Sequence, residues 1–193
     1  MKEARLLQSL SRLFHGEASE TPLETPEAFS ALYERDCLSV YRYLYGLHGG
    51  PAEDVEDLVA ETFARAWKAR RSFSGDPQTA GTAWLLGIAR RLVIDAYRRS
   101  RARIQPEDGP LDEVPQLGPT PEGLVLAGEQ REVLWRLLQR LPDEQREMLV
   151  LRYLLDWRVR QISQYLGIAE NTVSVAMRRA LVRLQREWLQ GKE

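Results

Sequence analysis

Apolar residues recur at three- and four-residue spacing along most of the chain, which is the pattern of amphipathic helices. This pattern covers residues 29–47, 49–69, 82–101 and 161–184, and a shorter apolar face runs through residues 2–14. No stretch alternates strictly between apolar and polar residues, and no internal repeat is present. The pattern therefore predicts an all-α fold.

The segment 161–184 predicts two short helices joined by a tight turn. Each helix has an apolar face, formed by Ile162, Tyr165 and Leu166 in the first and by Val173, Met177, Ala180, Leu181 and Leu184 in the second. Between them, Gly167 supplies a residue that tolerates the positive φ of such a turn. Arginines along the second helix are typical of a helix-turn-helix that binds a DNA major groove. An ordinary helical hairpin is the alternative.

The segment 49–69 begins with a Gly-Gly-Pro turn and an acidic first turn, both of which favour a helix start. Its expected buried stripe consists of Leu58, Val59, Thr62, Phe63, Ala66 and Trp67. Its front half carries five acids, Glu53, Asp54, Glu56, Asp57 and Glu61, which on the simplest interpretation complement the helix dipole. A loop rich in Gly, Pro and Thr follows at residues 73–82, and Thr82 is the expected N-cap of the next helix.

Proline and glycine divide the chain into two predicted helical domains. Residues 1–25 form an N-terminal extension with a possible short amphipathic helix, and a first helical domain covers residues 26–103. Residues 104–123 hold five prolines among acidic residues, which predicts an extended acidic linker. A second helical domain covers residues 124–193.

The formal net charge is only −1, but the charges are unevenly distributed. Residues 90–103 carry six arginines against Asp95 alone, and residues 156–186 carry six arginines against Asp156 and Glu170. The tract between them, residues 104–122, is acidic and contains no Lys or Arg. Two basic patches can bind phosphates even though the net charge of the chain is not positive. The alternative is that these arginines only form the solvent-exposed faces of helices.

Several classes of protein are excluded or unsupported by composition. A single cysteine, Cys37, excludes an intramolecular disulfide framework, and the two histidines, His15 and His48, show no ligand spacing. No phosphate loop or nucleophile–base pair points to an enzyme, and neither a metal nor a cofactor is expected. No apolar run reaches membrane-spanning length and no secretory apolar core begins the chain, so a cytoplasmic protein without membrane insertion is expected.

Two long motifs carry a family resemblance. The run EDVEDLVAETFARAW, followed by AWLLGIARRLVIDAYRR, resembles region 2 of the bacterial sigma-70 family of sigma factors. The run LQRLPDEQREMLVLRYLLDW with the helix-turn-helix resembles region 4. The two motifs occur in order, without an intervening region 3, as in the extracytoplasmic-function (ECF) group. The resemblance covers about residues 26–190 and implies a subunit that binds core RNA polymerase, recognises a two-part promoter and opens the DNA.

The resemblance also implies roles for particular residues. Core polymerase is expected to bind Asp54, Asp57, Leu58, Glu61 and Phe63. The minus-ten DNA element is expected to contact Trp84, Arg90, Arg91, Arg98 and Arg99, with a base flipped into the loop 73–82. The minus-thirty-five element is expected to contact Asn171, Thr172, Ser174, Arg178, Arg179 and Arg183. An anti-sigma factor is a further possible partner, and the acidic linker matches the connector that threads the polymerase cleft.

The chain departs from the usual family pattern at several positions. Ala60 and Arg91 stand where Gln and Asn are usual, and Ala169 replaces the usual Ser N-cap of the recognition helix. Residues 174–176 read Ser-Val-Ala where a basic residue, Ser and Arg are usual. Two alternatives therefore stay open: a degenerate sigma paralogue that no longer initiates transcription, and a helix-turn-helix regulator unrelated to polymerase binding.

Overall fold

The computed structural model describes residues 23–103 and 133–190, and the side chains of all of these except residues 97–103. All regular structure within these ranges is helical, which confirms the all-α prediction. The predicted helix at residues 2–14 and the predicted linker at residues 104–123 lie outside the described residues. No helix in the described ranges combines the length and the apolar character needed to cross a membrane.

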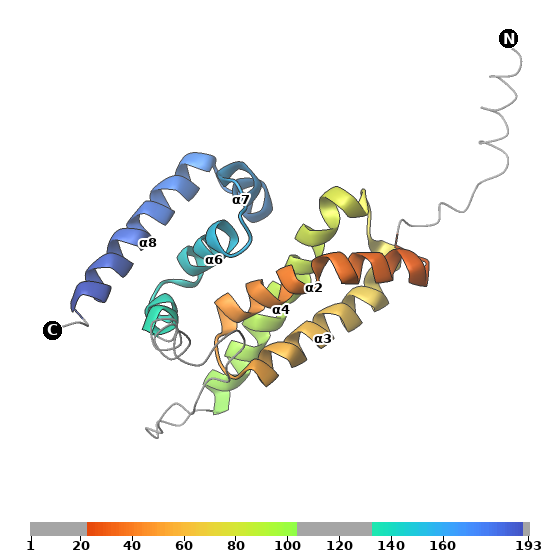
Figure 1. The fold of residues 1–193 in the computed structure, drawn as a ribbon, viewed down its shortest axis with the longest axis horizontal. Helices are drawn as coiled ribbons and strands as arrows, with labels where there is room; N and C mark the ends of the chain where they lie inside the picture. Colours follow the sequence, from red (N-terminus) through yellow and green to blue (C-terminus); the bar gives the residue numbers. More distant parts are fainter. Residues whose placement is uncertain (1–22, 104–132, 191–193) are drawn as a thin grey trace, which may run out of the picture.

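The first domain is a packed group of three helices (Figure 1): α2 (Pro26–His48), α3 (Ala52–Ala69) and α4 (Pro77–Arg103). A short 3₁₀ helix, η1 (Arg70–Ser72), follows α3. Their buried faces share an apolar core that includes Leu32, Val40, Leu44, Val55, Val59, Phe63, Leu85, Leu86, Ala89 and Val93. Most of the predicted stripe of α3 is buried, whereas Leu58 and Trp67 are half-buried. The spacing of apolar residues therefore predicted correctly which face of α3 is buried.

The start of α4 differs from the prediction. Thr82 was the expected N-cap, but α4 begins five residues earlier, at Pro77. The Asp76 carboxylate accepts a hydrogen bond from the backbone N–H of Gln78 at 2.9 Å, and proline is well suited to the first helical position. The prediction of a loop over residues 73–82 is therefore wrong for residues 77–82, which are helical, and correct for residues 73–76.

The second domain contains helical residues 133–139, then α6 (Asp143–Tyr153), α7 (Val159–Leu166) and α8 (Glu170–Gln190). Gly167 ends α7 with a φ of 70°, and its N–H donates to the Ser163 carbonyl at 2.9 Å. The Ser163 hydroxyl donates in turn to the Ile168 carbonyl at 2.5 Å. These bonds close the turn between α7 and α8, so the predicted helix-turn-helix is confirmed.

The apolar face of α8 is narrower than predicted. Val173, Met177 and Ala180 are buried as expected, but Leu181 is 41% exposed. The assignment of Leu181 to the buried face is therefore wrong. It follows Ala180, which is fully buried against the rest of the domain, and adjacent helical positions point about 100° apart.

The two domains pack against each other. Figure 1 shows α6 beside α2, and these two helices are in direct contact. Buried apolar side chains of both domains belong to one continuous cluster. Helices α3 and α8 lie away from this contact, on different sides of the molecule (Figure 1).

Candidate nucleic-acid and protein interfaces

The exposed face of α3 is acidic. Asp54, Asp57 and Glu61 all lie on the solvent side of this helix, opposite the residues that pack into the core. Glu61 forms an ion pair with Arg65, one turn further on, at 2.7 Å. Both side chains of this pair are about half exposed, so it contributes little to stability and can exchange partners.

The two apolar members of the predicted polymerase-binding set lie differently from the acids. Phe63 is only 6% exposed and packs edge-on against Tyr33 and Phe29, with ring centroids 4.6 and 6.4 Å away. Leu58 is half-buried. The structure therefore brings the three carboxylates together on the surface and leaves Phe63 to hold α3 against α2.

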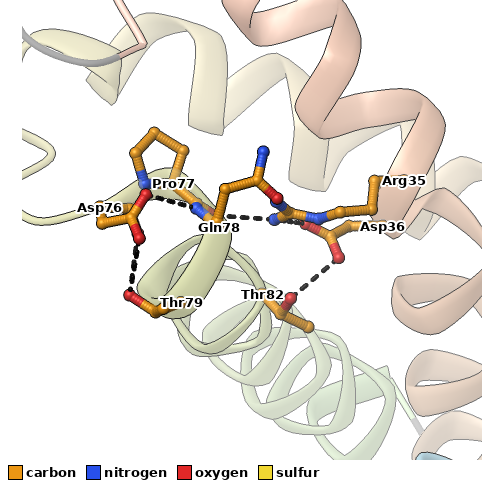
Figure 2. Close-up of polar contacts among 7 residues, drawn as sticks. All are labelled: Arg35, Asp36, Asp76, Pro77, Gln78, Thr79 and Thr82. Carbon is orange, nitrogen blue, oxygen red and sulfur yellow. Dashed lines mark hydrogen bonds and ion pairs between the residues drawn. The ribbon is translucent and has the colours of Figure 1, made fainter.

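A polar cluster joins α2 to the start of α4, as Figure 2 shows. The Asp36 carboxylate, in a residue that is 3% exposed, accepts from the Thr82 hydroxyl at 2.8 Å and from Arg35 at 2.6 Å. Arg35 also donates to the Pro77 carbonyl at 2.8 Å and to the Gln78 side chain at 2.9 Å. This cluster fixes the first turns of α4 and, with them, the end of the loop 73–76.

The other end of this loop is held by aromatic packing. Phe73 is buried, and its ring lies 5.0 Å from the ring of the half-buried Trp84. Trp84 lies two turns into α4 and belongs to the predicted minus-ten set. The loop 73–76 is therefore fixed at both ends by contacts to helices.

The arginines of α4 have different surroundings. Arg91 is exposed, whereas the guanidinium of Arg90 donates to the carboxylate of Glu147 in α6 at 2.9 Å. Burial lowers the pKa of Arg90, but the charge and hydrogen bond of Glu147 outweigh this effect and leave it raised. Arg98 and Arg99 lie near the end of α4, beyond the described side chains.

The predicted DNA-reading residues of α8 all face solvent. They are Asn171, Thr172, Ser174, Arg178, Arg179 and Arg183. Outward-facing residues of this helix line a hollow of about 530 Å³, made by Val175, Arg178, Arg179, Val182, Arg183 and Arg186. The surface therefore combines four cations with two valines, a mixture that suits phosphates flanking apolar base edges.

Two of the predicted DNA-reading side chains, Ser174 and Arg183, form hydrogen bonds within α8. The Ser174 hydroxyl donates to the Glu170 carbonyl at 2.9 Å, and Arg183 donates to the Glu187 carboxylate at 3.0 Å. The hydrogen bond from Arg183 lowers the pKa of Glu187. These bonds hold both side chains along the helix surface rather than away from it.

Sequence reasoning missed the buried carboxylates. Asp36 and Glu147 are each 3% exposed. Asp36 lies outside the quoted motifs, and the region 4 run that contains Glu147 does not distinguish it from the surface acids beside it. The one indication that Asp36 is buried was its position among the apolar residues of the stretch 29–47. Among the side chains that the structure describes, no group of three or more His, Cys, Asp or Glu could hold a metal ion.

Two family models match the chain in order. The model for sigma-70 region 2 matches residues 32–103, which contain most of α2 and all of α3 and α4. The model for sigma-70 region 4 matches residues 131–184, which contain the helix-turn-helix.

The chain is also similar to individual proteins. It is 33% identical over 183 residues to the ECF RNA polymerase sigma factor BldN of Streptomyces coelicolor, covering 95% of this chain but only 66% of that protein. It is 34% identical over 143 residues to SigL of Mycobacterium tuberculosis, covering 74% of this chain and 78% of SigL.

Solved structures share the fold. The sigma factor RpoE from Bartonella quintana, in complex with the anti-sigma factor NepR, matches with a TM-score of 0.64 at 23% identity, over 83% of this chain and 96% of RpoE. The two family models and the individual relatives thus agree. The chain belongs to the ECF RNA polymerase sigma factors, which are transcription initiation factors rather than enzymes.

Proposed function

We propose that this chain binds core RNA polymerase through α3, recognises minus-ten and minus-thirty-five promoter elements through α4 and α8, and promotes DNA opening. The observation that carries the proposal is the separation of charge between helices. Carboxylates occupy the exposed face of α3, and arginines occupy the exposed face of α8. The carboxylates suit a polymerase surface of opposite charge, and the arginines suit a DNA backbone.

The exposed acids support α3 as the polymerase-binding surface. Asp57 and Glu61 lie four residues apart, so their side chains share one face of the helix. The opposite face is fixed in the core by Val55, Val59 and Phe63, so α3 presents its charges on a rigid support. Rigid, complementary charges favour both the rate and the specificity of association.

The loop 73–76 and α4 support minus-ten recognition. The loop is held at one end by Phe73 and Trp84 and at the other by the Asp36 cluster. A rigid loop that leads into a helix carrying arginines suits the capture of an unpaired base, because stacking and phosphate contacts offset the few kcal/mol of unpairing. No nucleotide hydrolysis is needed for this step.

The helix-turn-helix supports minus-thirty-five recognition. The N-terminal part of a recognition helix usually meets the base edges. We therefore assign sequence reading to Asn171, Ser174 and Arg178, and backbone contacts to Arg179 and Arg183. Thr172, exposed beside Asn171, belongs to the same end of α8.

The remaining assignments follow from the family. We propose domain boundaries at residues 26–103 and 124–193, an acidic connector at 104–123, and regulation by an anti-sigma factor. The structural neighbour RpoE is itself bound to an anti-sigma factor.

A degenerate paralogue without initiation activity is the second candidate. Val175 is 40% exposed within the hollow of α8, where the family usually has a polar residue, and Ala176 is half-buried. Unlike that polar residue, Val175 offers no hydrogen bond to a phosphate or a base edge. Such a paralogue would still bind core polymerase, so a test of transcription separates the two candidates.

Charge reversal on α3 tests the polymerase-binding surface. In the variant Asp57→Lys with Glu61→Lys, we expect loss of binding to purified core polymerase, because the exposed face of α3 would repel a basic partner. Helicity should be retained, since both side chains face solvent. Pull-down with core polymerase measures the binding, and circular dichroism checks the fold.

A matched control uses acids that lie outside the proposed surface. Glu34 on α2 and Glu144 on α6 are also exposed, so Glu34→Lys with Glu144→Lys makes the same change in net charge. This control should bind core polymerase like the wild type. Equal affinity of all three proteins would refute the role of α3.

A further inference from the structure

The side chain of Gln78 lies on the rim of the loop 73–76. Gln78 belongs to the first turn of α4 and is exposed, and its backbone N–H donates to the Asp76 carboxylate at 2.9 Å. The loop ends at Asp76, only two residues before Gln78. A base held by this loop would therefore come within reach of the Gln78 amide.

Arg35 of α2 holds the Gln78 side chain in place. One terminal nitrogen of its guanidinium donates to Gln78 Oε1 at 2.9 Å. The other donates to the Pro77 carbonyl at 2.8 Å and to the Asp36 carboxylate at 2.6 Å (Figure 2). Three acceptors on two helices thus share one planar group, which restricts its rotation.

Arg35 is itself held from two sides. Its ion-pair partner Asp36 is 3% exposed and accepts from the Thr82 hydroxyl of α4 at 2.8 Å. Gly81 lies against the guanidinium, because a Cβ atom there would be 3.0 Å from Arg35 Nη2. The guanidinium is therefore fixed between two helices, and the amide that it binds is fixed with it.

This contact decides which way the amide of Gln78 points. A guanidinium has donors and no acceptor, so the amide atom that faces Arg35 has to be the oxygen. The amide nitrogen then points away from Arg35, as Figure 2 shows. Among the described residues no hydrogen bond uses this nitrogen. Gln78 therefore presents donors, and only donors, to solvent beside the loop.

The direction of these donors matters for the recognition of a base. At its edge, guanine or thymine carries an exocyclic oxygen where adenine or cytosine carries an amino group. An N–H of Gln78 pairs with the oxygen, whereas an amino group in its place leaves two donors facing each other. A freely rotating amide would accept either class of base by turning over, but the amide held by Arg35 cannot.

We propose that Gln78 is a specificity-determining residue of the minus-ten surface, and that Arg35 positions it to select guanine or thymine over adenine or cytosine. The proposal rests on the proposed function, because it takes the loop 73–76 as the site of an unpaired base. Arg35 acts through Gln78 and need not touch DNA. One hydrogen bond gained or lost changes relative affinity by about tenfold, which is enough to define a preferred base.

The variant Gln78→Glu tests the polarity of the contact. One carboxylate oxygen can accept from Arg35 as the amide oxygen does, and the other replaces the nitrogen, so a donor becomes an acceptor without a change of shape. With core polymerase and a promoter library randomised over the minus-ten element, the wild type should prefer guanine or thymine at one position. Gln78→Glu should prefer adenine or cytosine there, with a shift of about tenfold in relative transcript yield.

The added negative charge of this variant needs a control. Gln190 is an exposed glutamine at the end of α8, in the other domain, so Gln190→Glu makes the same chemical change outside the minus-ten surface. It should keep the base preference of the wild type. A general loss of affinity caused by the extra charge would lower all transcripts together, and comparison of yields within one library removes that effect.

Two substitutions of Arg35 test its positioning role. Arg35→Met removes the donors, so the amide of Gln78 can turn over, and the preference at that position should be relaxed rather than inverted. Arg35→Lys keeps a group that only donates, so it should retain the wild-type preference. A purely structural role would lower the yield from every promoter without changing the ratio between bases. Gln78→Glu, at an exposed position, decides the proposal even where Arg35→Met does not fold.

An unchanged base preference in Gln78→Glu would overturn the assignment of Gln78. An unchanged ratio between bases in a folded Arg35→Met chain would overturn the positioning role of Arg35. Failure of the proposed function gives a different result, because the wild type itself would then yield no transcripts with core polymerase.

Discussion

At the scale of single residues, buried polar side chains fix the geometry of the proposed DNA surface. Asp36 joins α2 to the first turns of α4 through Thr82 and Arg35. A Cβ atom at Gly81 would lie 2.6 Å from Leu32, so the helices are in close contact beside this cluster. Position and orientation of the loop 73–76 therefore depend on a carboxylate that DNA need not touch.

Replacing Asp36 should destabilise the first domain. In Asp36→Ala, the Thr82 hydroxyl loses its acceptor and the Arg35 guanidinium loses its ion-pair partner, so we expect the free energy of unfolding to fall by about 2–3 kcal/mol. Urea denaturation measures this change. Asp95 is an exposed acid on α4, and Asp95→Ala should stay within about 0.5 kcal/mol of the wild type. Equal losses in the two variants would contradict the role of the cluster.

His48 should make stability depend on pH. Burial lowers the pKa of His48, although Asp54 acts in the opposite direction. The unfolded chain, with a histidine pKa of about 6.5, then binds more protons than the folded chain as the pH falls through that value. The free energy of unfolding should therefore decrease from pH 7.5 towards pH 5.5. The variant His48→Gln should show a smaller decrease, and an equal decrease would refute the assignment.

At the scale of elements, apolar spacing predicted the helices well and their ends less well. The buried face of α3 and the helix-turn-helix followed directly from three- and four-residue spacing. The start of α4 was missed because Thr82 and the Gly-Pro-rich stretch suggested a loop, whereas Asp76 and Pro77 are the actual starting signals. Leu181 was misassigned because the contacts that define its face come from other helices.

The turn between α7 and α8 depends on one backbone conformation. Gly167 has a φ of 70°, and a Cβ atom there would meet nothing within 4 Å. The cost of Gly167→Ala is therefore conformational, and we expect a loss of about 1–2 kcal/mol in the free energy of unfolding. Gly87→Ala has equally open space within α4, so it should gain about 0.5–1 kcal/mol. Thermal or urea unfolding of both variants compares them, and the same sign for both would contradict this account.

At the scale of the whole molecule, the arrangement of the two domains could not be predicted from the sequence. Tyr43 and Glu147 are 104 positions apart, and although Glu147 lies in the region 4 run, nothing in either local sequence indicates that the two side chains meet. Gly49 was expected only as part of a Gly-Gly-Pro turn, and nothing in the sequence singled out Gly46. Their spacing to Trp135 and Val150 appears only in three dimensions. The family could be inferred from two local motifs, whereas the domain contact depends on long-range pairing.

The contact between α2 and α6 leaves the charged faces of α3 and α8 exposed, whereas Arg90 of α4 is bonded to Glu147.

Run-off transcription with purified core polymerase and genomic DNA fragments tests the central claim most directly. The account predicts discrete transcripts that require this chain, and none with Asp57→Lys, Glu61→Lys, since that variant cannot bind the polymerase. The control Glu34→Lys, Glu144→Lys should support transcription from the same start sites as the wild type. Binding to core polymerase without any transcript from the wild type would contradict initiation and favour a degenerate paralogue.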